Sequence, residues 1–476
     1  MSQRTKKELV KTNNAEIVTN SYIKNAAMYF DKHDNFDSYL FMKELLNKLN
    51  IIYIEKIGFY IFNNRYWQSV EEGFISKIIH KGLEKFAKPK YVSEVLKSIK
   101  NEVYRPLEIL NKNRSRIVLK NGTLDLSQWE SPYFYDNEYF LEDYSTIYLD
   151  YNYDIKAVYP KFQRYLDSTF VGYPDDVKTV QEMFGYCLTT STKFEKIFIL
   201  YGEGGTGKSV LIDTLKKLVT EKNYCSIPMS LLDKSFLRAG LKDKTLNLAT
   251  EESSKTMRET VTAWIKAISS GDPIEAQFKN KDTFNFNPFC KLVFAMNNLP
   301  QFENFDEALK RRMIIIKFNH KFRGDNIDLE LKEGKLYKEM DGILLWALEG
   351  LKRLAKQKSF TYSQQAIECV ENYRLESNHA ERFAHEYLDV GEPESFIKVK
   401  DAYKKYCDVC KANNEKPFKN PEFCTIIKRK YNLPEKREQK KIKQNNGSFI
   451  TEDVFKTLLF KDSSKDNNVI PLKKSS

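Results

Sequence analysis

The chain has 476 residues and a formal net charge of +12, with 41% hydrophobic and 30% charged residues. This length is too great for one ordinary core, so about three domains are expected, and the basic balance suits a polyanionic partner or simply a soluble basic protein. No segment approaches the ~20 apolar residues that span a bilayer and no apolar signal segment follows the N-terminus, which predicts a cytoplasmic protein without a membrane partner.

The first 150 residues are predicted to form an α+β domain. The segment 59–67 has the pattern of a β-hairpin that turns at Asn63-Asn64, and 117–126 has that of a second hairpin with Asn121-Gly122 in the turn. Apolar residues at helical spacing predict a helix over 74–86. No catalytic constellation is apparent in this part of the sequence, and its task stays open.

Two further helices are predicted over 162–170 and 177–188, ahead of a nucleotide-binding domain that ends in a long amphipathic helix. The segment Ser359–Ser363 is predicted to be a linker to a helical, basic C-terminal module. The predicted domains are an α+β domain over 1–150, a helical collar over 151–191, a nucleotide-binding domain over 192–355, a DNA-binding domain over 364–460 and a disordered tail over 461–476.

The glycine-rich stretch Gly202–Ser209 is the most specific motif of the chain. An apolar run over 196–201 precedes it and helical spacing follows it, which is the strand–loop–helix context of a phosphate-binding loop. Backbone N–H groups would close around phosphate oxygens, Lys208 would reach the β- and γ-phosphates, and the Ser209 hydroxyl would hold Mg²⁺. The predicted nucleotide-binding residues are Gly202, Glu203, Gly204, Gly205, Thr206, Gly207, Lys208, Ser209 and Val210.

Polar side chains follow two more predicted strands. The strand over 245–250 ends in Glu251-Glu252, and we assign Glu251 to the Mg²⁺ side and Glu252 to the attacking water, with the order left open. The strand over 291–296 ends in Asn297, whose amide can hold that water. Two surface glutamates and a turn asparagine are the alternative interpretations.

Basic residues stand beside the remaining elements of this domain. Arg311 and Arg312 precede a predicted strand over 313–318, where one of them could reach a neighbouring subunit's γ-phosphate, although a solvated basic cluster would have the same sequence. The polar tip between Phe278 and Phe284 suits a hairpin, in which Lys279 and Lys281 would contact a phosphate backbone.

The C-terminal module has the pattern of a winged helix. A helix is predicted to start at Asn420-Pro421, a basic strand over 436–443 follows, and Asn445-Asn446-Gly447 supplies the turn before the return strand. The helix would enter a major groove and the wing would track phosphates; a basic tail without sequence preference is the alternative. The predicted DNA contacts here are Lys428, Arg429, Lys430, Lys436, Arg437, Lys440, Lys441 and Lys443.

The cysteines indicate a metal site only weakly. Cys407 and Cys410 have CxxC spacing, but the sequence holds no second such pair. On a helix predicted over 399–412 the two would share one buried face. A packing role is therefore expected for both.

The order of these elements resembles the superfamily 3 helicases of the AAA+ class, and most closely the phage and plasmid primase-helicase family. The match is carried by Gly202–Ser209, Glu251-Glu252, the segment 270–286, Asn297 to Pro300 and Arg311-Arg312. Upstream, 121–126 and 185–188 also look like segments of that family. Replication initiators of staphylococcal pathogenicity islands are similar in plan.

The resemblance implies an α/β fold with an AAA+ P-loop core, ATP and Mg²⁺ as cofactors, and hexameric rings with ATP bound between subunits. It further implies 3′→5′ movement on single-stranded DNA, with the hairpin tip facing the central channel. The partners expected on this basis are single-stranded DNA, origin duplex DNA, other copies of the chain and a separate primase or polymerase.

Three functions are compatible with this pattern. The leading hypothesis is an ATP-dependent DNA helicase and replication initiator of a mobile genetic element. The second is an origin-binding protein that uses ATP only as an assembly switch, against which the Glu251-Glu252 pair and the arginines argue. The third is a primase-helicase, although about 150 N-terminal residues without a clear acidic metal site leave little room for a priming domain.

Overall fold

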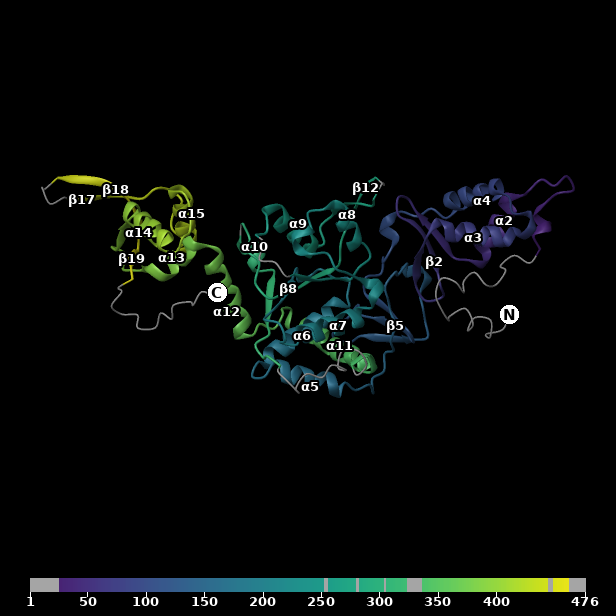
Figure 1. The fold of residues 1–476 in the computed structure, drawn as a ribbon, viewed down its shortest axis with the longest axis horizontal. Helices are drawn as coiled ribbons and strands as arrows, with labels where there is room; N and C mark the ends of the chain where they lie inside the picture. Colours follow the sequence, from purple (N-terminus) through teal and green to yellow (C-terminus); the bar gives the residue numbers. More distant parts are fainter. Residues whose placement is uncertain are drawn as a thin grey trace. The chain divides into compact units, whose positions relative to one another are not determined.

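The computed structural model describes residues 25–251, 256–279, 282–303, 305–322, 336–443 and 448–461. They fall into two compact units, both drawn in Figure 1. The first comprises Met1–Glu303 and Arg311–Ala366, and the second comprises Asn304–Lys310 and Ile367–Ser476. Among the described residues, no helix combines the length and the apolar character that a membrane span requires.

The first unit begins with three helices that pack on a small antiparallel sheet of order β1-β2-β3. Phe41, Ile75 and Ile99 are fully buried between them. The predicted hairpin and its turn are confirmed, because the Asn63 side chain accepts the backbone N–H groups of Arg65 and Tyr66. The elements are α2 (Ser38–Lys48), β1 (Ile51–Ile54), β2 (Gly58–Phe62), β3 (Trp67–Val70), α3 (Glu72–Leu83) and α4 (Pro89–Glu102).

A second sheet of order β6-β5-β4-β7 contains the other predicted hairpin. The turn lies one residue earlier than expected: Leu119 pairs with Gly122, so Lys120 and Asn121 form the two-residue turn. Gly122 opens the second strand, where a Cβ would lie 2.1 Å from the Tyr135 carbonyl oxygen. The strands are β4 (Arg116–Leu119), β5 (Gly122–Asp125), β6 (Tyr133–Asp136) and β7 (Tyr148–Leu149).

The two predicted collar helices are α5 (Pro160–Thr169) and α6 (Pro174–Cys187), and α6 packs on the long helix α11 (Met340–Gln357). Glycines permit this close approach. A Cβ on Gly185 would lie 2.3 Å from the Ala347 carbonyl oxygen, and one on Gly350 would lie 2.4 Å from the Gln181 backbone. Side chains at these positions would therefore force the helices apart.

A five-stranded sheet of order β14-β8-β13-β10-β9 forms the centre of the first unit, and all its pairings are parallel. Figure 1 shows α8 and α9 on one side of β8 and α6 and α7 on the other, and burial on both faces explains the continuous apolar runs. The four predicted strands are confirmed to within a residue. The elements are β8 (Ile197–Tyr201), α7 (Lys208–Val219), β9 (Tyr224–Cys225), α8 (Ser235–Arg238), β10 (Leu246–Glu251), α9 (Glu259–Ser270), β11 (Ile274–Gln277), β12 (Thr283–Phe286), β13 (Lys291–Met296) and β14 (Met313–Lys317).

Lys291 is buried at the start of β13. Its Nζ donates to the carbonyl oxygens of Thr189 (2.5 Å) and Phe289 (2.9 Å) and lies 4.7 Å from the centroid of the Tyr186 ring. Burial lowers the pKa of Lys291 to about 7, because the charged form loses its hydration.

We expect Lys291→Met to flatten the pH dependence of stability. The pKa of the amine is lower in the folded than in the unfolded chain, so the unfolded chain binds more protons between about pH 7 and about pH 10. The stability that this group contributes therefore rises with pH across that window. Urea unfolding at several pH values measures the effect, and a pH slope equal to that of the parent would contradict it.

The prediction that Ser359–Ser363 is a linker is wrong. Phe360 is 2% exposed and packs edge-on against Tyr186 and Phe198. The buried Glu182 carboxylate accepts the Thr361 backbone N–H at 2.7 Å. The segment is therefore part of the core of the first unit, and an aromatic residue in a polar stretch was the sign of that packing.

The second unit packs helices α13, α14 and α15 against the antiparallel sheet β16-β18-β17. Phe383, Tyr406, Phe423 and Phe455 are buried at its centre. In Figure 1 the β17–β18 hairpin extends beyond the helices of its own unit. The predicted tail, from residue 462 onward, lies outside the described residues. The elements are α10 (Glu307–Lys310), α12 (Gln364–Ser377), α13 (His379–Tyr387), β15 (Leu388–Val390), β16 (Phe396–Lys398), α14 (Val399–Ala412), α15 (Asn420–Lys430), β17 (Gln439–Lys443), β18 (Phe449–Lys456) and β19 (Leu458–Phe460).

Candidate functional site

The glycine-rich loop joins the carboxyl end of β8 to the first turn of α7, as the sequence predicts. Gly205 and Gly207 have φ values of +78° and +88°, a conformation in which other side chains are strained. A Cβ on Gly202 would lie 2.6 Å from the Phe318 carbonyl oxygen. Glycine at these positions lets the backbone N–H groups gather at a helix N-terminus, where an anion is favoured.

Lys208 folds back along this loop. Its Nζ donates to the carbonyl oxygens of Gly202 and Glu203, the latter at 2.6 Å. Burial lowers the pKa of the Lys208 amine. The neighbouring Ser209 is exposed at the start of α7. The amine thus lies within the loop, on a flexible stem that can turn toward a phosphate.

A second cation at the loop was not predicted. Lys321 Nζ lies 2.7 Å from Glu203 Oε2, and this contact holds the pKa of the Glu203 carboxyl below its usual range. The chain after β14 crosses the loop at this point, because the Phe322 N–H donates to the Gly205 carbonyl at 3.0 Å. Nothing in the local pattern connects Lys321 with a loop 118 residues earlier.

Helix α5 also contacts the loop. The Tyr165 hydroxyl donates to the Gly207 carbonyl at 2.9 Å. Thr169 ends the same helix, and its Oγ1 would lie 3.4 Å from a Cβ on Gly207. This hydroxyl is buried and, within the described part of the chain, has no hydrogen-bond partner. Helix α5 therefore forms one wall of the candidate site, a contact that sequence reasoning missed.

The register of the sheet brings three predicted elements to one edge. Glu251 pairs with Met296, and Met296 pairs with Tyr201, so the ends of β10, β13 and β8 are level. The exposed Asn297 follows β13 directly. The backbone of Glu251 is thus at the same edge as the glycine loop, while Glu252 lies outside the described residues.

Arg311 and Arg312 lie at the opposite edge. Met313 pairs with Ile197, the first residue of β8, and the Ile197 N–H donates to the Arg312 carbonyl at 2.8 Å. The length of β8 separates this edge from the glycine loop, roughly 13 Å at ~3.3 Å per residue. Neither arginine is therefore placed to reach a phosphate held by its own glycine loop.

The side chains of the two arginines differ in their exposure and in their contacts. The Arg312 side chain is 8% exposed, and its guanidinium contacts Glu195 Oε2 at 2.6 Å, Ser270 Oγ at 2.8 Å and Ser269 Oγ at 3.2 Å. The Arg311 side chain is 68% exposed and lies 3.7 Å from the same Glu195 carboxylate. Arg312 is thus engaged within its own chain, and Arg311 is the better placed of the two to reach outward.

The predicted hairpin is present, with Ile274 paired to Phe286 and Gln277 paired to Thr283. Lys279 is exposed at its tip. The other predicted phosphate contact, Lys281, lies outside the described residues.

In the second unit, the cations at the end of α15 contact the protein itself. Lys428 Nζ donates to the Glu435 carbonyl at 2.8 Å, Arg429 lies 3.2 Å from Glu381 Oε1, and Lys430 Nζ donates to the Glu381 carbonyl at 3.0 Å. Burial lowers the pKa of Lys430 to about 8. Lys428 and Lys430 are therefore less available to DNA than the sequence indicates, whereas the Arg429 side chain stays 58% exposed.

Strand β17 presents its lysines on alternating faces. Lys441 and Lys443 are exposed on one face, while Lys440 Nζ lies 4.2 Å from the Phe396 ring centroid on the other. Lys436 and Arg437 are exposed just before the strand. A groove of about 1030 Å³ separates α15 from this hairpin. The predicted turn at 445–447 lies outside the described residues.

Of the CxxC pair, Cys410 is buried as the predicted packing role requires, whereas Cys407 is only half-buried. Cys410 is buried 3.8 Å from His379 Nδ1, and the same ring nitrogen contacts the Tyr406 hydroxyl at 2.6 Å. Across the part of the chain that the structure describes, no three His, Cys, Asp or Glu side chains are grouped as a metal site would require.

Two family models match parts of the chain. Residues 38–171 match the model described as "D5 N terminal like", and residues 200–312 match one described as a "Family of unknown function (DUF5906)". The second match begins at the end of β8 and ends at Arg312, so it contains the glycine loop, the strand ends and both arginines.

Two curated relatives are viral proteins. The chain is 31% identical over 150 residues to "Putative helicase L207/L206" of Acanthamoeba polyphaga mimivirus, a match that covers 29% of this chain and 15% of that protein. It is 29% identical over 248 residues to "Putative helicase 184R" of Invertebrate iridescent virus 6, covering 48% of this chain and 24% of that protein. Each match thus spans less than a quarter of the relative's own length.

Solved structures share the fold. The apo structure of the NrS-1 C-terminal region (305–718) superposes with a TM-score of 0.53 and 17% identity, covering 88% of this chain and 99% of that one. An A-form apo structure of the same region gives a TM-score of 0.51 and 16% identity, with 89% and 100% coverage. The mixed α/β architecture around a parallel sheet is therefore similar to that of the NrS-1 C-terminal region.

Proposed function

We propose that the chain is an ATP-dependent DNA helicase that initiates replication of a mobile genetic element, acting as a hexameric ring that moves 3′→5′ on single-stranded DNA. The observation that carries this proposal is that the predicted site residues lie at opposite edges of one parallel sheet. The glycine loop, Glu251 and Asn297 occupy one edge, and Arg311 occupies the other. The helicase names of the two viral relatives support the same class of activity.

Because the proposed site residues lie at opposite edges of the sheet, a complete catalytic site would require two copies of the chain. An arginine that cannot reach its own loop can still stabilise transition-state charge on a nucleotide bound by the next copy of the chain. Such a head-to-tail contact between identical chains closes into a ring when its rotation allows. The strand order, with the glycine loop after β8, supports the assignment of an AAA+ core.

The residues at the loop edge suit ATP with Mg²⁺. Ser209 and Glu251 would hold the metal, which neutralises charge on the β- and γ-phosphates when bound. Lys208 would turn from the loop carbonyls toward the same phosphates. Asn297 would orient the attacking water, and Glu252 is its proposed polarising group.

The second unit is the proposed origin-binding module. Its order of helix α13, strands β15 and β16, helices α14 and α15, and hairpin β17–β18 supports the winged-helix assignment. The exposed lysines of β17 would then follow the phosphates of duplex DNA, and α15 would lie in the major groove. The same module would deliver the ring to the origin before unwinding.

The proposal is tested by ATP-dependent strand displacement on forked duplexes that carry a tail of either polarity. A helicase of the proposed direction separates the fork with a 3′ tail on the loading strand and leaves the 5′-tailed one paired. ATP-dependent duplex binding without strand displacement would instead favour the alternative of an origin-binding protein in which ATP controls assembly only. Displacement of the 5′-tailed substrate alone would show movement in the 5′→3′ direction and would still support helicase activity.

The exposed lysines of the wing lead to a separate prediction. We expect Lys441→Ala together with Lys443→Ala to weaken binding to duplex DNA and to reduce the slope of log K against log salt by about 0.9 for each phosphate that is no longer neutralised. Fluorescence anisotropy at several salt concentrations measures both. Lys411→Ala, at an exposed lysine near the end of α14, is the matched control. An unchanged slope in the double variant would show that the wing does not contact the DNA.

A further inference from the structure

Three phenylalanines form a continuous aromatic ladder along the β11–β12 hairpin. The ring centroids of Phe278 and Phe284 are 5.0 Å apart with planes at 17°, and those of Phe284 and Phe286 are 5.8 Å apart at 30°. The register places them on one face, because Phe284 pairs with Ala276 and Phe286 pairs with Ile274. The ladder therefore runs from the base of the hairpin to its tip.

The side chains on this face of the hairpin become more exposed toward the tip. Ile274 and Ala276 are 1% and 0% exposed at the base, whereas Phe278 and Phe284 are only half-buried. Lys279 follows Phe278 directly and is exposed. The outer hairpin thus combines a pair of parallel aromatic rings with an adjacent cation, the pairing of groups that binds unstacked bases and the phosphates between them.

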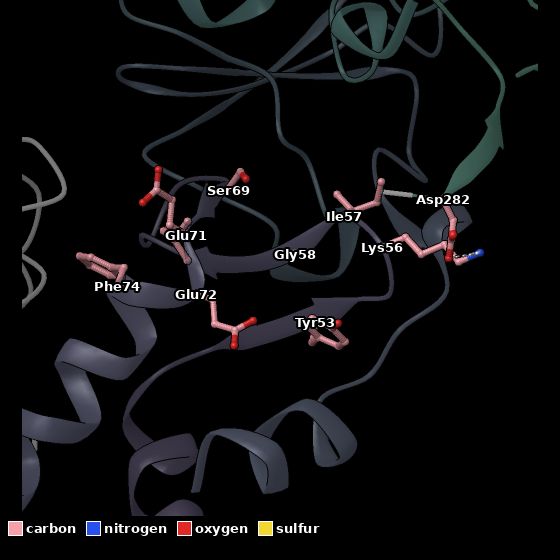
Figure 2. Close-up of a pocket in the computed structure, with 10 residues that line it drawn as sticks. Tyr53, Lys56, Ile57, Gly58, Ser69, Glu71, Glu72, Phe74 and Asp282 are labelled. Carbon is pink, nitrogen blue, oxygen red and sulfur yellow. Dashed lines mark ion pairs between the residues drawn. The ribbon is translucent and has the colours of Figure 1, made fainter. Parts of the chain in front are cut away.

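One acidic residue near the tip of the hairpin has a basic neighbour. Asp282, the acid at the tip, has Lys56 Nζ 3.8 Å away, so its repulsion of phosphate is partly offset. Figure 2 shows this pair at one end of a groove of about 1060 Å³, with Glu71 and Glu72 at the other end. Two carboxylates make the groove a poor path for a phosphate backbone, which leaves the ladder as the surface that such a strand would follow.

We propose that Phe278 and Phe284 are a stacking platform for the unpaired bases of single-stranded DNA, with Lys279 on the adjacent phosphate. This inference rests on the proposed helicase function and deepens it. The motor would then hold its track partly by stacking, which is independent of base sequence because every base has an aromatic face.

The test measures binding of an oligothymidylate to the full-length protein by anisotropy over a range of salt concentrations. Phe278→Leu and Phe284→Leu keep an apolar side chain in the hairpin but remove the ring, and we expect each to weaken binding roughly 5–100-fold without changing the salt slope. Phe278→Trp should bind at least as well as the parent. Lys279→Ala should instead reduce the slope by about 0.7.

Tyr133→Ala, which removes an exposed ring from strand β6, is the matched control and should bind as the parent does. Thermal unfolding of each variant checks that the hairpin substitutions leave the fold intact. Parent-like binding by both leucine variants would overturn the platform while leaving the helicase proposal standing. A parent protein that does not bind the oligothymidylate at all would overturn both.

Discussion

Lys208→Ala is expected to lower ATP turnover by at least about 10²–10³-fold, because it removes the cation that we propose turns toward the charge developing on the transferred phosphoryl group. The Lys208 amine already lies inside the loop and donates to the Gly202 and Glu203 carbonyls. Phosphate release measures turnover, and anisotropy with duplex DNA should remain close to that of the parent because the second unit is untouched.

A matched control lies on the same helix. Lys217 is exposed at the far end of α7, where its amine lies over the Tyr337 ring and remote from the glycine loop. Lys217→Ala should therefore hydrolyse ATP at the parent rate. Undiminished turnover by Lys208→Ala would exclude the glycine loop as the site of hydrolysis.

Arg311→Ala is expected to lower ATP turnover by roughly 10³-fold or more, with nucleotide binding retained. The physical reason is its position: an exposed guanidinium at the sheet edge opposite the loop is too far from its own nucleotide to bind it, and in the proposed ring it would stabilise charge on a neighbour's nucleotide. Steady-state turnover and equilibrium binding of a labelled ATP analogue separate the two effects. Sedimentation should show that the variant still assembles.

Arg312→Ala distinguishes the two arginines. Its guanidinium is buried against Glu195, Ser269 and Ser270, so alanine would remove these contacts and lower stability by about 1–3 kcal/mol. We therefore expect a fall in the urea midpoint as its main effect. If Arg312→Ala kept parent stability and lost hydrolysis while Arg311→Ala stayed active, the roles assigned to the two would be exchanged.

The glycine loop and the strands around it could be predicted because their signals are local. A run of apolar residues specifies a buried strand, and Gly205 and Gly207 specify positive φ, whatever the rest of the chain does. The helix over Val399–Ala412 and the strand over Lys291–Met296 were likewise determined by short-range periodicity. Glycines at the α6–α11 crossing had no such signal, since only the partner helix explains them.

The parts of the site that were missed depend on contacts between distant residues. Lys321 and Tyr165 reach the loop from segments on either side of it in the sequence, and no spacing rule connects them with Gly207 or Glu203. Burial decides between Arg311 and Arg312, which are equivalent in sequence. The linker assigned to Ser359–Ser363 failed for the same reason, because the aromatic partners of Phe360 lie far from it in sequence.

In the proposed ring each ATP site is built from two copies of the chain, and mixing two inactive variants tests this arrangement most directly. Lys208→Ala retains Arg311, and Arg311→Ala retains the glycine loop, so assemblies formed from equal amounts of both contain complete sites at about one quarter of their interfaces. We predict that co-assembled variants recover ATP turnover that neither shows alone. Co-assembly without any recovery would contradict a site shared between neighbours.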